Sequence, residues 1–76
     1  MTRQEFVREI RKVLEWPDDA FDESTELKGH DKWDSLGRLA TMTFVDEELD
    51  LTLSAKALDG IQRVEDLVRL TTSKLD

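Results

Sequence analysis

The chain has no cysteine among its 76 residues and only one histidine, His30. The absence of cysteine excludes a disulfide framework, a cysteine-based metal site and a catalytic thiol, and nothing indicates an oxidising compartment. One histidine is too few for a histidine metal site or a Ser-His-Asp triad, so we expect His30 in a solvent-exposed loop. The sequence therefore argues against catalysis by the chain's own side chains.

Long apolar runs are also missing: no stretch approaches the length of a membrane span, and no hydrophobic signal region follows the first five residues. Lys and Arg total 11 against 18 Asp and Glu, which gives a net charge of -7. This charge repels nucleic-acid phosphates and anionic membranes and favours partners with basic patches. We expect a cytoplasmic, soluble monomer that binds neither nucleic acid nor membrane.

The segment from residue 18 to residue 32 is acidic and has only two main apolar anchors, Phe21 and Leu27. A loop this long in so small a domain is either functional or a sign of a wrong assignment, and burial of these two side chains would hold it on the fold. Calcium loops that begin at Asp18 or Asp22 would lack the glycine at the sixth position and the glutamate at the twelfth. We therefore expect no EF-hand and no metal site.

Four segments carry helical signals. Thr2 and Glu5 form a capping box for a first helix from Thr2 to Glu15, which Trp16-Pro17 ends. Further helices are expected over residues 35–49, 54–58 and 64–74, with Gly60 ending the third. The alternating Leu51 and Leu53 have no second strand to pair with. The prediction is one all-α domain over residues 1–76, a small four-helix bundle of three longer helices and one short helix, with a long first loop.

The predicted second helix begins at the tripeptide Asp34-Ser35-Leu36. Its apolar residues occupy more than one stripe, so either part of its surface meets a partner or a cargo, or the small bundle packs closely around this helix. Because a helix N-terminus has unpaired N–H groups and a positive dipole end, a phosphoester on Ser35 would be stabilised there. The alternative from the residues alone is that Ser35 is a plain helix cap.

A longer pattern surrounds this tripeptide. The acidic cluster Asp46-Glu47-Glu48 is followed by residues 49–53, by the short third helix, by Ile61 and by residues 64–68. In this order and spacing, essentially the whole chain closely resembles the acyl carrier proteins. The resemblance implies that a phosphopantetheinyl transferase attaches 4'-phosphopantetheine from coenzyme A to Ser35. The arm would supply the thiol that the chain lacks and carry acyl groups as thioesters between enzymes of lipid or specialised-metabolite biosynthesis.

The resemblance also implies roles for other residues. Asp34 and Leu36 would belong with Ser35 to the cofactor-binding motif. The arm or its cargo would be sheltered by Leu39, Leu58 and Ile61, with a place in the core as the alternative for all three. The basic patches of partner enzymes would meet Asp46, Glu47 and Glu48. Trp33 would either pack the loop against the helix ends or also contact the arm or a partner.

The chain departs from the fatty-acid carriers after the tripeptide, where Gly37 replaces a usually acidic residue and Arg38 follows. This weakens charge-based recognition beside Ser35 and favours a specialised carrier. Arg38 is hypothesised to pair with the phosphodiester on Ser35. Two alternatives stay open: an aminoacyl or peptidyl carrier with the same arm, and an unmodified helical interaction module in which Ser35 is only a cap.

Overall fold

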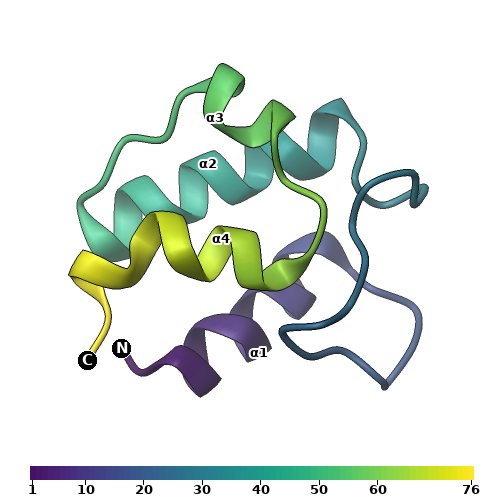
Figure 1. Ribbon diagram of the computed structural model, residues 1–76, viewed down its shortest axis with the longest axis horizontal. Helices are drawn as coiled ribbons and strands as arrows, with labels where there is room; N and C mark the ends of the chain where they lie inside the picture. The colour runs from purple at the N-terminus through teal and green to yellow at the C-terminus, as the bar shows by residue number, and fades with distance from the viewer.

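The computed structural model describes residues 1–76 and contains four α-helices and no strand (Figure 1). The helices are α1 (Arg3–Leu14), α2 (Ser35–Leu49), α3 (Ala55–Asp59) and α4 (Val64–Thr71). In the view of Figure 1, α3 lies above α2, and α1 lies below α4. The predicted all-α architecture is confirmed, although only α1 and α2 are longer than ten residues, so the bundle has two long helices instead of three.

The start of α1 follows from the capping box predicted from the sequence. The Glu5 N–H donates to Thr2 Oγ1 at 3.1 Å, and the Thr2 N–H donates to Glu5 Oε1 at 2.9 Å. The helix ends at Leu14 because Glu15 adopts a left-handed conformation with φ of 53°, and Trp16-Pro17 then leads away from it. These local signals place α1 within one residue of its predicted bounds.

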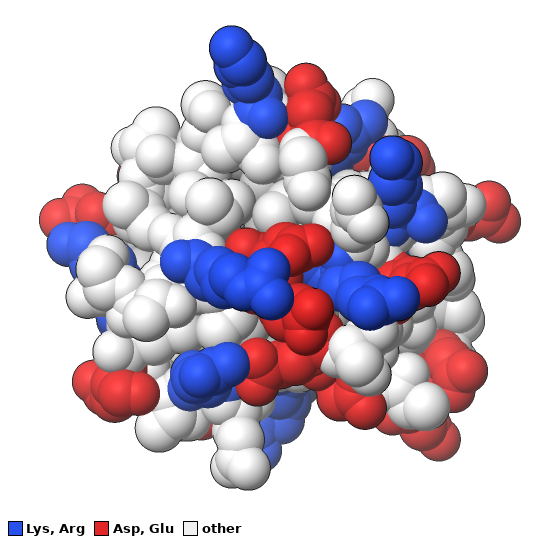
Figure 2. Space-filling model, viewed as in Figure 1, with Lys and Arg blue, Asp and Glu red and all other residues white.

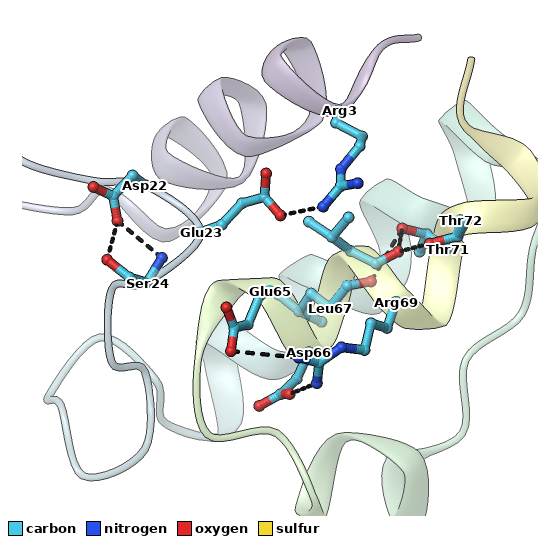
Figure 3. Close-up of polar contacts among 11 residues, drawn as sticks. Arg3, Asp22, Glu23, Ser24, Glu65, Asp66, Leu67, Arg69, Thr71 and Thr72 are labelled. Carbon is cyan, nitrogen blue, oxygen red and sulfur yellow. Dashed lines mark hydrogen bonds and ion pairs between the residues drawn. The ribbon is translucent and has the colours of Figure 1, made fainter.

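The end of α4 differs from the prediction, which extended this helix to Lys74. The α-helix stops at Thr71, and a 3-10 turn, η1, covers Thr72–Lys74. The Thr71 hydroxyl donates to the Leu67 and Val68 carbonyls, and the Thr72 hydroxyl donates to the Val68 carbonyl (Figure 3). Two adjacent threonine side chains thus bond the last turn of the backbone, which is a known cause of local departure from α-helical geometry.

The core draws on all four helices and on the long loop. Phe6, Ile10, Leu27, Val45, Val64 and Leu67 are its fully inaccessible members. Fifteen apolar side chains form one continuous cluster, and burying each of them contributes on the order of 1.5 to 3 kcal/mol. Thr41 and Thr71 are buried with them, and each hydroxyl donates to a helix carbonyl, so no buried side-chain nitrogen or oxygen is left unpaired.

The long loop between α1 and α2 is fixed to the fold, as predicted, by Leu27, which is fully buried. Phe21 packs on Trp16, with ring centroids 5.2 Å apart. Backbone bonds add to these anchors: the Leu27 N–H donates to the Gln62 carbonyl at 2.8 Å, and the Val64 N–H donates to the Thr25 carbonyl at 3.0 Å. The loop therefore runs antiparallel to the segment that precedes α4.

His30 corrects one prediction, because it is not a solvent-exposed loop residue. Its ring stacks on Trp16 with centroids 3.8 Å apart and an interplanar angle of 25°, and it is half-buried. His30 Nδ1 also accepts the Lys32 N–H at 3.0 Å. Trp16 is fourteen positions away from His30 in the sequence, so this contact gives no local sequence signal. The stack fixes the loop close to the start of α2.

Charged side chains cover α4, where basic and acidic groups interleave across the middle of the face in Figure 2. Arg69 pairs with Glu65 and Asp66 on the same helix (Figure 3). Asp66 Oδ2 also accepts the Arg63 and Gln62 N–H groups, both at 2.9 Å. These backbone bonds, with the Arg69 charge, favour the ionised carboxylate and hold the pKa of Asp66 below its ordinary value of 3.8.

Asp66 should therefore give the fold a pH-dependent stability. Because its pKa is lower in the folded chain, ionised Asp66 stabilises the fold above pH 3.8, and this contribution is lost as pH falls through the folded value. Asp66→Asn should unfold at lower urea concentration than the wild type at about pH 6, and the gap should narrow below pH 3.8. Asp31→Asn removes an exposed carboxylate and serves as the charge control. A gap of constant size across the pH series would contradict the assignment.

Candidate functional site

Ser35 is the first residue of α2, as predicted, but it does not cap the helix. The cap is Asp34, whose Oδ1 accepts the Gly37 N–H at 2.7 Å. The side chain of Ser35 is exposed, and its hydroxyl takes no part in this capping bond. The view of Ser35 as a plain helix cap is thus corrected: the carboxylate one residue earlier has that role, and the Ser35 hydroxyl stays available at the helix N-terminus.

Because Asp34 caps α2 and Ser35 does not, their substitution by alanine should lower the free energy of unfolding by different amounts. Asp34→Ala should lower the free energy of unfolding by about 1 kcal/mol, because the Gly37 N–H loses its partner. Ser35→Ala should change it by less than about 0.5 kcal/mol, as for other surface substitutions that break no contact. Chemical denaturation of both variants beside the wild type measures the difference. Equal losses in the two variants would show that the hydroxyl shares the cap.

A groove lies between α2 and α3, next to Ser35. It has a volume of about 280 Å³ and is lined by Ser35, Arg38, Leu39, Met42, Ala55 and Leu58. Two of the three residues predicted to shelter the arm or cargo, Leu39 and Leu58, line this groove. The third, Ile61, does not line it and lies in the core with 3% of its surface exposed. The groove offers a small, mostly apolar surface beside Ser35.

Arg38 lies at this groove, but its partner is a carboxylate. Arg38 Nη1 donates to Asp59 Oδ1 at 3.0 Å, across the gap from α2 to the end of α3. The hypothesised pairing of Arg38 with a phosphodiester stays a prediction. Sequence reasoning missed Asp59, because an ion pair between two helices 21 positions apart has no periodic signal.

Gly37 explains how the loop approaches the start of α2. A Cβ atom on this residue would overlap the Lys32 carbonyl oxygen and would lie 3.1 Å from Leu14 Cδ2. The Gly37 carbonyl also accepts the Thr41 hydroxyl at 2.9 Å. The backbone of the loop at Lys32 therefore packs directly against α2 at Gly37.

A second groove, of about 730 Å³, lies on the opposite flank of α2, against the end of α1. Leu36, Ala40 and Phe44 contribute to it from α2, with Val13 from α1 and Lys32 from the loop. Leu36 is 75% exposed and Leu39 is 58% exposed. These values fit the expectation that α2 has more apolar surface than the core uses.

The remaining predicted residues lie away from Ser35. Asp46, Glu47 and Glu48 are exposed near the end of α2, and only Glu47 lines the second groove. Their contact with basic partners stays a prediction. Trp33 is 8% exposed and packs in the core, which agrees with the first of its two alternatives. Its contact with an arm or a partner also stays a prediction.

No protein-family model, curated protein or solved structure matches this chain. No cluster of three or more His, Asp or Glu side chains is arranged to hold a metal ion. None of the helices has the length and apolar character needed to cross a bilayer.

Proposed function

We propose that this protein is an acyl carrier protein that bears a 4'-phosphopantetheine arm on Ser35. The observation that supports this most is the exposed Ser35 hydroxyl at the first position of α2, beside a capping residue that leaves it available. The ordered resemblance of the sequence to acyl carrier proteins supports the same reading. When bound, the arm supplies a terminal thiol that holds an acyl group as a thioester.

The residues around Ser35 fit such a group. A phosphodiester on Ser35 would lie at the N-terminal end of α2, where the helix dipole and unpaired backbone N–H groups stabilise an anion. Asp34 already accepts the Gly37 N–H, so the other N–H groups of the first turn are left for the phosphate. The groove between α2 and α3 begins at Ser35 and gives an arm or its cargo an apolar surface.

The proposed partners follow from charge. A phosphopantetheinyl transferase and acyl-transferring enzymes would meet α2 through basic patches, since Asp46, Glu47 and Glu48 are exposed and have no cationic partner within the chain. The exposed side chain of Leu36 would add an apolar contact beside the groove that Glu47 also lines. We propose a cytoplasmic setting, in which coenzyme A and these enzymes are present.

The test is intact mass after incubation with coenzyme A and a broad-specificity phosphopantetheinyl transferase. A gain of one phosphopantetheine supports the carrier function. No gain, while a control carrier is modified in the same tube, would favour the unmodified interaction module, which the exposed Leu36 and Leu39 also allow. Loading with fatty-acyl ligases against amino-acid-activating enzymes then separates an acyl carrier from an aminoacyl or peptidyl carrier.

A further inference from the structure

The ion pair between Arg38 and Asp59 is the only salt bridge that joins α2 to α3. The helix α3 has five residues and buries one of them, Leu58. Its position over α2 therefore depends on few contacts, of which this pair lies at the edge of the groove. Arg38 is 36% exposed and Asp59 is 69% exposed, so water weakens the pair and a competing anion can displace it.

Ser35 and Arg38 both line this groove and are one turn apart on α2. Side chains three positions apart on a helix are neighbours on its surface. The long Arg38 side chain thus has two places for an anion within reach: Asp59 across the groove and the Ser35 oxygen on its own helix. A guanidinium binds phosphate oxygens through paired N–H groups, which favours a phosphodiester over one carboxylate contact.

The ion pair matters more for Asp59 than for Arg38. Asp59 is the last residue of α3, where a carboxylate opposes the helix dipole unless a cation neutralises it. Loss of the Arg38 contact would leave this charge uncompensated at the end of a five-residue helix. The end of α3 would then open more often, and the groove beside Leu58 would widen.

We propose that Arg38 is a latch shared by two anions, Asp59 in the unmodified chain and the phosphodiester on Ser35 after modification. Attachment of the arm draws Arg38 from Asp59, loosens α3 and opens the groove in the modified protein. Arg38 and Asp59 are positioning residues, and neither reacts. This inference rests on the proposed carrier function for the identity of the anion, but sharing of Arg38 can be tested without the arm.

The first test uses Ser35→Glu, which places a carboxylate one turn from Arg38, and Ser35→Gln as the neutral variant of similar size. The probes are the Leu58 and Ile61 amides, which donate to the Ser54 and Leu58 carbonyls at the two ends of α3. Their hydrogen exchange should be about two- to five-fold faster in Ser35→Glu than in Ser35→Gln, the factor expected for loss of an exposed ion pair. Equal exchange in the two variants would overturn the latch.

The second test asks whether the carboxylate introduced at position 35 acts through Arg38. Arg38→Gln leaves Asp59 charged and without its partner, so it should itself speed exchange at Leu58 and Ile61 by about two- to five-fold, and Ser35→Glu should add nothing further in that background. Additive effects would mean that the introduced carboxylate acts without Arg38 and would overturn the proposal. Glu26→Gln breaks another exposed long-range pair, with Arg63, and should leave exchange in α3 unchanged.

The third test uses the arm. Modified wild-type protein should exchange as fast at Leu58 and Ile61 as unmodified Arg38→Gln, and modification of Arg38→Gln should add no increase. If the mass shows one phosphopantetheine but exchange at Leu58 and Ile61 is unchanged, the carrier function stands and the latch is overturned. If no arm is attached, the carrier function fails, and the Glu and Gln variants still decide whether Arg38 is shared.

Discussion

Ser35→Ala is expected to abolish completely the gain of one phosphopantetheine that the proposed function predicts for the wild type with coenzyme A and a transferase. In the proposed carrier the arm is attached through the serine oxygen, and no neighbouring hydroxyl would replace it, because the residues from Asp34 to Ala40 contain no other Ser or Thr. The fold should be unaffected, since Asp34 and not Ser35 caps α2. Intact mass measures the modification, and circular dichroism with urea denaturation measures the fold.

A matched control comes from a second serine at a helix start. Ser54 Oγ accepts the Ala57 N–H at 3.0 Å and caps α3, so its hydroxyl is structural. Ser54→Ala should keep the full mass gain and lose about 1 kcal/mol of stability. This is the reverse of the result expected for Ser35→Ala. A mass gain that persists in Ser35→Ala, or disappears in Ser54→Ala, would contradict the assignment of the attachment site.

Gly37→Ala adds a single methyl group near Ser35 and is expected to lower the free energy of unfolding substantially. Its Cβ atom would overlap the Lys32 carbonyl oxygen, which is backbone and can move only with the whole loop. Such overpacking costs about 1 to 3 kcal/mol, although alanine is the better helix former at an unobstructed position. Each kcal/mol should lower the melting temperature by about 4 to 8 °C in a domain of this size.

Gly60→Ala is the control for that variant. A Cβ at Gly60 would lie 3.9 Å from the Ala57 carbonyl oxygen, an ordinary contact, and the backbone has a φ of -88°. This substitution should leave the melting temperature almost unchanged. If Gly37→Ala melted at the same temperature as Gly60→Ala, close approach of the loop to α2 would not explain the glycine. The same contact explains why an acidic side chain at position 37 would not fit this chain.

Local signals in the sequence were enough to predict most helices. The starts of α1 and α3 follow from Thr2 with Glu5 and from Ser54, because a cap acts on residues within three positions of itself. The bounds of α2 follow from the polar loop before it and the helical spacing after it. The end of α4 could not be predicted in this way, since its 3-10 turn depends on which carbonyls the Thr71 and Thr72 hydroxyls bond.

The candidate site was predicted in part. The position of Ser35 at the helix start follows from the sequence. That Asp34 and not Ser35 caps the helix depends on which side-chain oxygen accepts the Gly37 N–H. The contacts of Arg38 with Asp59 and of His30 with Trp16 were missed. Both contacts join elements that are distant along the chain. Hydrophobic periodicity indicates which face of a single helix is buried, but not which distant residue it contacts. Ile61 was assigned to the arm, although its spacing also fits the core in which it lies.

The antiparallel run of the long loop beside the segment before α4 has a consequence for the order of folding. The Glu26 and Arg63 side chains that meet there are 37 positions apart, and contacts so distant require closure of a large part of the chain before they form. Helical proteins usually fold fast because their contacts are local, and this pairing raises the contact order. The loop that presents Ser35 cannot dock until residues 62–65 are available to receive it. On the ribosome, where the N-terminal part emerges first, we expect Ser35 to reach its ordered setting only after residues 62–65 are made.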